Sequence, residues 1–275
     1  MTDQTETLRR IAEALERMVP PSPAPTDWLG APAYVWDGAK ARAVAHLEAP
    51  ALALLRGIDA QKSVVTANVN RLAAGHAAHD MLLWGSRGMG KSALLRASIA
   101  AAQADLPGTI ALVQVTPDAL PSLALLFAEL AHHDRRFLVF IDDLGFEEGD
   151  GAGPRALRSW LEGGVEARPR NVRLAVTSNR RVIVARNMSE QDDPINPRDV
   201  VDDRLALADR FGLSVGFHNC SQDDYLAIIG GYADSFGLSW DQSDALEWSK
   251  RRGGRSGRVA WHYVTELAGR VGRQV

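Results

Sequence analysis

Cysteine is almost absent from this sequence, since Cys220 is the only one among 275 residues. A lone cysteine cannot form an intrachain disulfide, so a reducing, cytoplasmic compartment is expected. The chain also lacks an apolar run of the ~18 residues that a membrane helix needs, and no membrane insertion is expected. Its first residues, Thr2 to Glu6, are polar and do not read as a signal peptide.

A strong excess of charge of either sign is missing as well. The formal net charge is −3, so no global basic field demands nucleic acid as a partner. Hydrophobic residues make up 46% of the chain and charged residues 24%, which is typical of a globular protein. The length fits one large domain, or a core with a small satellite domain.

The N-terminal region is set apart by its pattern. Residues 6–18 place Leu8, Ile11, Leu15 and Met18 on one helical face, which predicts an amphipathic helix. Such a helix docks on its own core or on a sister subunit; membrane association is the weaker reading, because the polar face mixes acids and bases. A proline-rich linker follows, so we expect segments at 1–25 (helix and linker) and 26–56 (extension).

From residue 57 onward, short apolar runs alternate with helical patterns. The expected strands are 81–84, 110–115, 137–141, 172–177 and 213–217. The expected helices between them are 92–102, 122–132, 156–162 and 200–211. This alternation predicts an α/β domain over 57–219, with a five-stranded parallel sheet flanked by helices. Three further helices, at 223–236, 242–251 and 258–271, predict a small α-helical domain over 220–275.

The segment from Gly85 to Ser92 matches the pattern G-x-x-x-x-G-K-[ST] in full, after an expected strand and at the start of an expected helix. Glycines in such a loop let backbone N–H groups surround an anion, and the helix dipole adds to the attraction. Lys91 is expected to reach the β- and γ-phosphates of a nucleoside triphosphate, and Ser92 to offer a hydroxyl to Mg²⁺. We therefore predict a site for ATP and Mg²⁺.

A second acidic motif ends the strand expected at 137–141. Ligands of parallel sheets collect at the carboxyl ends of the strands, where Asp142 can hold Mg²⁺ and Asp143 can act as the base for the attacking water. Asp143 is one methylene shorter than the usual glutamate, so hydrolysis is expected to be slow. Glu147 and Glu148 remain as alternative contributors, although an acidic loop in solvent also accounts for them.

Two classes of nucleotide-binding protein do not fit, since the sequence has neither the Asn-Lys-x-Asp guanine reader nor an Arg-rich lid inserted in the sheet. With Thr177-Ser178-Asn179-Arg180 after the fourth strand, the chain resembles the AAA+ ATPases, a type of P-loop NTPase. The resemblance implies that Asn179, or failing it Thr177, is the sensor 1 residue that orients water near the γ-phosphate. It also implies that the helical domain is a lid over the nucleotide.

Two arginines match further AAA+ positions. Asp209-Arg210-Phe211-Gly212-Leu213 resembles the segment that carries an arginine finger, so Arg210 is expected to reach the site of a neighbouring subunit, with Arg204 as the alternative. The run from Gly253 to Ala260 resembles sensor 2, where a lid arginine contacts nucleotide. Arg258 fits that role, and Arg255 is the alternative.

The resemblance narrows to an uncharacterised bacterial AAA+ family that is catalogued as a domain of unknown function with an ATP-binding core. It covers about residues 50 to 270 and includes the motifs Arg56 to Lys62 and Ser221 to Leu226. The resemblance implies that Gly57 and Ile58 contact adenine. The expected nucleotide-binding set is therefore Gly57, Ile58, Gly85, Ser86, Arg87, Gly88, Met89, Gly90, Lys91, Ser92, Ala93 and Arg258, with Ser92 and Asp142 as metal ligands and Asp143, Asn179 and Arg210 as catalytic residues.

Other features are weaker. Residues 181–203 are long for a loop and are either a partner-binding insertion or a plain connection. The His132-His133 pair lacks a third metal ligand nearby. The basic cluster of Lys250, Arg251, Arg252, Arg255 and Arg258 could touch DNA, but AAA+ sites need such arginines for nucleotide, so nucleic acid is not the favoured partner.

Two functions from different classes remain. The first is an ATP-hydrolysing enzyme that works as a homo-oligomer and remodels an unknown protein or other macromolecular client. The second is a low-turnover binding module, a loader or adaptor controlled by ATP and acting on DNA-processing machinery. Arg210 favours the first, and the short side chain of Asp143 leaves room for the second.

Overall fold

The computed structural model describes residues 4–7, 9–10, 25–144, 157, 160–161, 168–179 and 210–275. Residues 4–7 and 9–10 are helical, as are 157, 160 and 161, but most of the helices expected at 6–18, 156–162 and 200–211 lies outside the described residues. So does the segment 181–203. No helix in the described ranges is long and apolar enough to cross a membrane.

The strands form one sheet in the order β2-β1-β4-β5-β6-β3-β7. Their bounds are β1 Ala33–Trp36, β2 Ala41–Val44, β3 Met81–Gly85, β4 Ile110–Val115, β5 Arg136–Ile141, β6 Val172–Ser178 and β7 Leu213–Phe217. All neighbouring strands pair in parallel except β1 and β2, which pair antiparallel. The fold class is the expected α/β type, with the five expected strands at the centre and at one edge.

The expected count of five strands is corrected to seven. β1 and β2 lie within the stretch 26–56, for which no element was expected, and β1 extends the sheet by pairing with β4. Each of these strands has four residues, which is too short for a clear period-2 pattern. Tertiary contacts hold β1 in place: Trp36 is fully buried, and its indole N–H donates a hydrogen bond of 2.7 Å to Ser122 Oγ.

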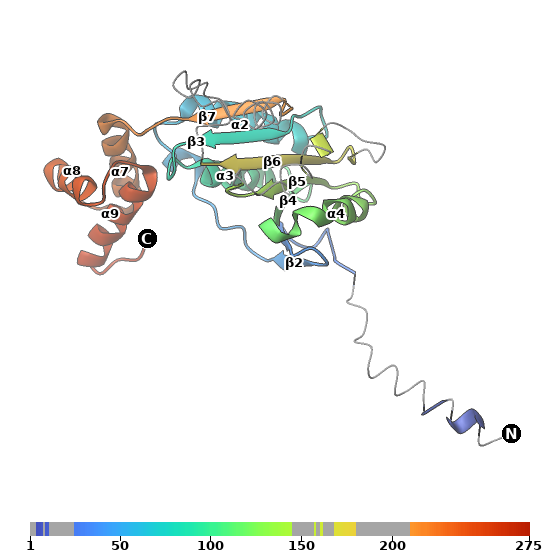
Figure 1. Ribbon diagram of the computed structural model, residues 1–275. Coiled ribbons are helices and arrows are strands. Elements are labelled where there is room, and N and C mark those ends of the chain that lie inside the picture. The colour runs from blue at the N-terminus through green and yellow to red at the C-terminus, as the bar shows by residue number, and fades with distance from the viewer. Residues whose placement is uncertain are drawn as a thin grey trace, which may run out of the picture.

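Helices cover both faces of the sheet and form a separate group at one end (Figure 1). Their bounds are η1 Leu52–Leu54, α2 Asp59–Ala73, α3 Lys91–Asp105, η2 Pro117–Ser122, α4 Leu123–Leu130, α7 Gln222–Phe236, α8 Gln242–Arg251 and α9 Gly257–Arg270. Helix α2 was not among the expected elements. The helices α7 to α9 occur where three helices were expected after residue 220, and they lie beyond the carboxyl ends of the strands.

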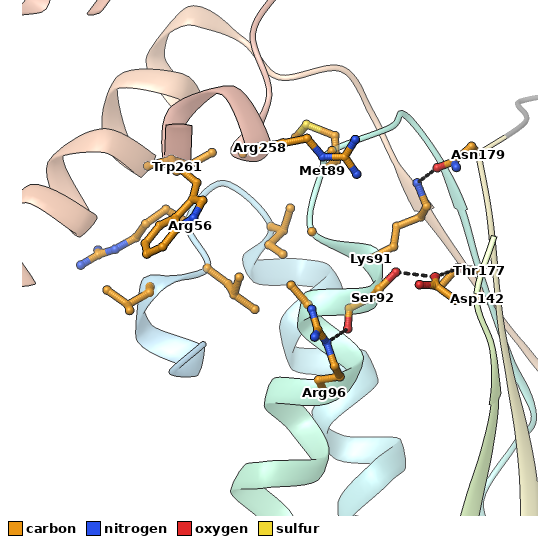
Figure 2. A pocket seen from close by; sticks show the side chains of 18 of the residues that line it. Arg56, Met89, Lys91, Ser92, Arg96, Asp142, Thr177, Asn179, Arg258 and Trp261 are labelled. Carbon is orange, nitrogen blue, oxygen red and sulfur yellow. Dashed lines mark hydrogen bonds between the residues drawn. The ribbon is translucent and has the colours of Figure 1, made fainter. Parts of the chain in front are cut away.

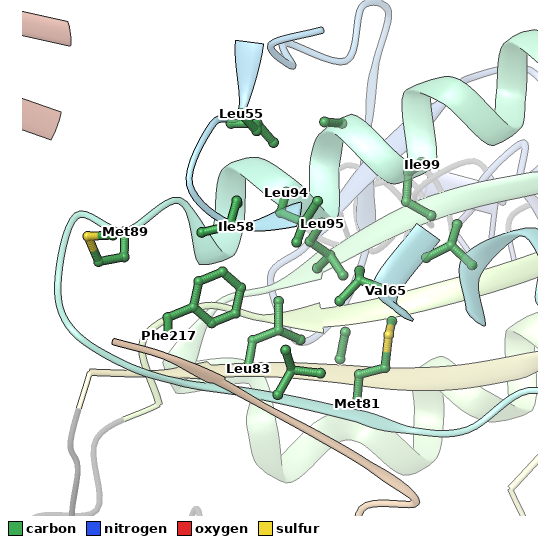
Figure 3. Close-up of a cluster of buried hydrophobic side chains, with 14 of the residues drawn as sticks. Leu55, Ile58, Val65, Met81, Leu83, Met89, Leu94, Leu95, Ile99 and Phe217 are labelled. Carbon is green, nitrogen blue, oxygen red and sulfur yellow. The ribbon is translucent and has the colours of Figure 1, made fainter. Parts of the chain in front are cut away.

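Alternate residues of the central strands enter two different cores. Met81 and Leu83 pack with α2 and α3 in one cluster, whereas Leu82 between them packs with α4 in the other. This follows from the pleat of a strand, which sends successive side chains to opposite faces. Figure 3 shows the first cluster, where Ile58 and Met89 bring the phosphate loop and the start of α2 against the same core. The loop is therefore anchored on well-packed side chains at both ends.

Candidate nucleotide-binding site

The loop from Gly85 to Ser92 joins β3 to α3 as its motif predicts. Gly85 has a φ of 118°, and a side chain there would place Cβ 2.1 Å from the backbone oxygen of Phe217, so only glycine fits. Gly90, the residue before α3, has a φ of 87°, a left-handed conformation that favours glycine. The chain thus turns tightly into the N-terminus of α3, where free N–H groups and the helix dipole favour an anion.

Lys91 is the central cation of the site. It is only 5% exposed, and its Nζ donates hydrogen bonds of 2.9 Å to the backbone oxygens of Gly85 and Ser86 and to Oδ1 of Asn179. Burial lowers the pKa of Lys91 below its ordinary value, and the nearby carboxylates of Asp143 and Asp142 oppose that shift. A buried ammonium held this way gains most from an anionic ligand, because little water screens the attraction.

Ser92 and Asp142 meet across the gap between α3 and β5. The Ser92 hydroxyl donates a hydrogen bond of 2.6 Å to Oδ1 of Asp142, and the Thr177 hydroxyl donates another of 2.6 Å to the same oxygen (Figure 2). Thr177 in turn accepts a bond of 2.8 Å from the backbone N–H of Asp143. Thr177 therefore fixes the orientation of both aspartates relative to the phosphate loop.

Asp143 lies at the other side of this arrangement, with a φ of 52° that is unusual for a residue other than glycine. Its Oδ1 accepts a hydrogen bond from the side-chain amide of Asn179, and its Oδ2 lies 3.6 Å from Arg87 of the phosphate loop. Two side chains, Asn179 just after β6 and Arg87 of the phosphate loop, thus meet at the carboxylate of Asp143. The two expected catalytic residues Asp143 and Asn179 are in direct contact.

The helical group closes the site from the opposite side. The backbone N–H of Arg258, at the start of α9, donates a hydrogen bond of 3.2 Å to the oxygen of Gly88. A side chain on Gly257 would come within 3.1 Å of the same oxygen, so the two backbones are in close approach. Arg258 lines the cavity, as expected of sensor 2, whereas the alternative Arg255 lines a neighbouring hollow.

These residues surround a cavity of about 350 Å³. Of the expected binding set, Ile58, Gly88, Met89, Gly90, Lys91, Ser92, Ala93 and Arg258 line it, together with Asp142, Asp143, Thr177 and Asn179. Gly57, Gly85, Ser86 and Arg87 do not. Gly57 lies against Asp224 at the start of α7, with a φ of 73°.

One end of the cavity was not anticipated from the sequence. It is lined by Leu54, Leu55, Arg56, Arg96, Ile228, Tyr232 and Trp261, most of which are apolar or aromatic. Ile228 and Tyr232 are four residues apart on α7, and Trp261 follows Arg258 by three residues on α9. This spacing places each pair on one helical face, and it is the only sequence signal that could have indicated them.

Arg210 is described but lies elsewhere in the same chain. It comes three residues before Leu213, which pairs with Met81 at the amino end of β3, whereas the phosphate loop leaves the carboxyl end. At ~3.3 Å per residue, the length of β3 alone separates the two ends by roughly 13 Å. The alternatives Arg204, Glu147 and Glu148 lie outside the described residues.

A mostly parallel sheet with a phosphate loop after β3, an acidic strand end nearby and a following group of helices has the architecture of the AAA+ type of P-loop NTPase fold. The expected fold class is confirmed in this respect. The chain belongs to the family described as Protein of unknown function (DUF815), which matches residues 30–271. No curated protein sequence matches it.

Several solved structures are similar in fold. The RuvB Holliday junction branch migration motor of Thermotoga maritima is 17% identical over 79% of this chain and 65% of its own, with a TM-score of 0.51. The P216G mutant of the same protein is 17% identical over 82% of this chain and 69% of its own, with a TM-score of 0.54. The Orc1 protein of Aeropyrum pernix, in a structure with DNA, is 14% identical over 80% of this chain and 65% of its own, with a TM-score of 0.55. At these identities the likeness shows the fold alone.

Proposed function

We propose that this chain is an ATPase that binds ATP with Mg²⁺ and hydrolyses it slowly, coupling the reaction to a macromolecular client. The observation that carries the proposal is the convergence of Lys91, Ser92, Asp142, Asn179 and Arg258 on one cavity. These residues come from four separate segments of the chain, so the sequence motif alone does not require them to meet. Their chemistry fits a triphosphate: two cations, a metal-binding pair and a polar amide.

The two ends of the cavity suit the two ends of an ATP molecule. The phosphates would lie along the N–H groups of the phosphate loop and against Lys91, where Arg258 adds a second positive charge from the lid. The adenine would occupy the apolar end, between Ile58, Ile228 and Trp261. Burying an aromatic base against such side chains removes apolar surface from water and stabilises the complex.

The pair formed by Ser92 and Asp142 suits Mg²⁺, which prefers oxygen ligands and keeps several waters. The two side-chain oxygens are already 2.6 Å apart, and Thr177 holds the carboxylate in place. When bound, the metal neutralises charge on the β- and γ-phosphate oxygens. Asp142 and Ser92 would hold it directly or through water.

Asp143 would accept a proton from the attacking water. Asn179 donates to its carboxylate, which orients it, and the same Asn179 also contacts Lys91. A general base must lie within hydrogen-bond reach of the water that it activates. Asn179 would also contact that water or the γ-phosphate, since it lines the cavity beside Lys91.

The enzyme would be complete only in an oligomer. Arg210 lies near the amino end of β3, away from the phosphate loop of its own chain. From that end Arg210 would serve the site of a neighbouring subunit, where it would stabilise the charge that develops on the γ-phosphate. We therefore propose a homo-oligomer with sites shared between subunits.

A second candidate function is an ATP-controlled binding module with little turnover, a loader or adaptor. The observation that favours it is the engagement of Asp143 by both Asn179 and Arg87. The two contacts engage both carboxylate oxygens, so an attacking water would have to displace one of them to reach Asp143. Comparison of the steady-state rate of ATP hydrolysis with ATP affinity separates the two functions.

The nucleotide site is tested by Lys91→Ala. A charge-assisted contact to phosphate contributes ~1.5–3 kcal/mol, so at least ~10-fold weaker ATP binding is expected in calorimetric titrations. Lys40→Ala is the matched control, because Lys40 is exposed in the turn between β1 and β2. Unchanged ATP affinity in Lys91→Ala would falsify the nucleotide site.

A further inference from the structure

A second hollow of about 820 Å³ adjoins the nucleotide cavity, and Met89 lines both. We call it the basic groove. Its walls are the phosphate loop, with Ser86 and Arg87, the segment after β7, with Asn219, and the end of α8 with the following loop, including Lys250 and Arg255. It therefore lies between the sheet domain and the lid.

The groove is positively charged. Arg87, Lys250 and Arg255 line it, and no aspartate or glutamate is among its lining residues. Within the described part of the chain, the side chains of Lys250 and Arg255 take part in no hydrogen bond or ion pair. Two other cations of the lid are neutralised by acids: Arg251 pairs with Glu247, and Arg270 pairs with Glu266 at 3.0 Å. Among the described residues, Lys250 and Arg255 thus bring two positive charges without an acidic partner to the groove, beside Arg87.

The chemistry of the lining indicates what the groove would hold. None of the lining residues is aromatic, so bases have nothing to stack on, whereas guanidinium and ammonium groups bind phosphate oxygens strongly. The apolar residues Met89 and Cys220 are each only 7% exposed, so the groove offers little apolar surface to bind the apolar side chains of an acidic peptide. The hollow is open and has a volume of about 820 Å³, which leaves room for an extended polyanion as well as for a single phosphate.

We propose that the basic groove binds the phosphodiester backbone of a single-stranded nucleic acid, without reading its base sequence. Contacts to phosphates position a protein on nucleic acid but carry no sequence information. The basic cluster at residues 250–258 is thereby divided in two: Arg258 faces the nucleotide cavity, whereas Lys250 and Arg255 face the groove. The sequence alone left this cluster open to DNA but favoured nucleotide as its ligand.

Arg87 connects the groove to the candidate catalytic centre. It lines the groove, and its guanidinium lies 3.6 Å from Oδ2 of Asp143. The contact is loose and the Arg87 side chain is 71% exposed, so a backbone phosphate in the groove competes for it. Withdrawal of Arg87 frees one carboxylate oxygen of Asp143. Provided that Asp143 is the base of the proposed ATPase, strand binding is expected to raise the rate of hydrolysis.

The groove is tested first by direct binding, without ATP. A fluorescent oligo-dT strand of about 20 nucleotides is titrated with the full chain, and anisotropy is measured over a range of salt. Three phosphate contacts predict a slope of about −2 in log K against log[salt] for a single strand. No binding at low salt, or a slope near zero, overturns the groove. Inorganic polyphosphate of equal charge is the second arm: it should compete with the strand, because the groove contacts phosphates alone, and a preference for polyphosphate overturns a nucleic acid ligand.

Charge reversal localises the contact. Lys250→Glu should weaken strand binding ~10-fold or more, as expected for loss of a charge-assisted phosphate contact. Arg251→Glu is the matched control, with the same change in charge at the next position; Arg251 pairs with Glu247 and does not line the groove. It should change affinity by less than about twofold. Equal effects of the two variants would show binding to a diffuse surface charge and would overturn the groove.

The coupling through Arg87 is tested by the rate of ATP hydrolysis with and without the strand. Stimulation in the wild type that is lost in Lys250→Glu, with the basal rate unchanged, supports it. Strand binding with no change in rate overturns the coupling. The two proposals fail separately: a chain that binds the strand through Lys250 but does not bind ATP refutes the ATPase alone, and an ATPase that ignores the strand refutes the groove alone.

Discussion

Oδ1 of Asn179 accepts a hydrogen bond of 2.9 Å from Nζ of Lys91. The same side chain donates to Asp143, so one amide joins the expected phosphate-binding cation to the expected base. Asn179→Ala should leave ATP affinity within a few-fold of wild type, since Lys91 keeps its two backbone acceptors. Turnover should fall ~10²-fold, the scale on which loss of one preorganised polar group acts. Steady-state kinetics and ATP titrations check both parts, and unchanged turnover contradicts a sensor role.

The two aspartates after β5 should separate metal binding from base catalysis. Asp142→Ala removes an oxygen that the Ser92 and Thr177 hydroxyls both contact, and it should abolish the dependence of ATP binding on Mg²⁺. Asp143→Asn keeps the shape of the side chain but cannot take a proton, so it should retain binding and lose turnover. Affinity is measured with Mg²⁺ and with EDTA. Normal hydrolysis by Asp143→Asn would show that Asp143 is not the base, and Glu147 and Glu148 would be tested next.

Arg210 should act between subunits. Arg210→Ala is expected to leave the ATP affinity of the isolated chain nearly intact and to lower turnover by ~10³-fold or more, because a finger acts on charge that develops in the transition state. Wild-type specific activity should rise with protein concentration. Mixing Arg210→Ala with Lys91→Ala should restore part of the activity, because some interfaces then pair an intact loop with an intact finger. Concentration-independent turnover that ignores Arg210 rejects the oligomer.

Arg258 should behave in the opposite way. It lines the cavity of its own chain, and its backbone contacts Gly88 of the phosphate loop. Arg258→Ala should therefore weaken ATP binding already in the monomer, by ~10-fold for one lost charge-assisted contact. Arg255→Ala is the matched comparison, since Arg255 lines the basic groove instead. Restoration of Arg258→Ala activity by a partner subunit with intact Arg210 would contradict a role in cis.

The lid should lose stability in alkali. Burial raises the pKa of Tyr225 from 10.0 to about 12; the phenol is fully buried and donates a hydrogen bond of 3.2 Å to the oxygen of Ala245. Because the folded pKa is the higher one, the contribution of the neutral phenol is complete below pH 10 and is lost as pH rises toward about 12. Tyr225→Phe should lower the free energy of unfolding by about 1 kcal/mol at neutral pH. The variant should also lose less stability than the wild type between neutral and alkaline pH. Urea unfolding of both chains at neutral and alkaline pH checks it, and parallel pH profiles contradict the assignment.

Much of the site could be predicted from the sequence because its parts are local. The phosphate loop is a run of eight consecutive residues, Gly85 to Ser92, and its glycines and lysine can be recognised from the sequence alone. Asp142 directly follows one expected strand and Asn179 lies two residues after another, and parallel strands bring their carboxyl ends to one edge. The five expected strands are long enough for their apolar residues to show, so the fold class followed from periodicity and order.

The remaining features depend on contacts between segments that are distant in the sequence. β1 and β2 become strands because β4 offers β1 a free edge, not because their four residues carry a strong pattern. The apolar end of the cavity needs α7 and α9 to dock beside η1. The close approach of Gly257 to Gly88 fixes the start of α9. This packing decides that Arg258 lines the candidate nucleotide cavity and Arg255 lines the basic groove. Local sequence determined which groups the chain possesses, and only long-range packing decided which of them meet.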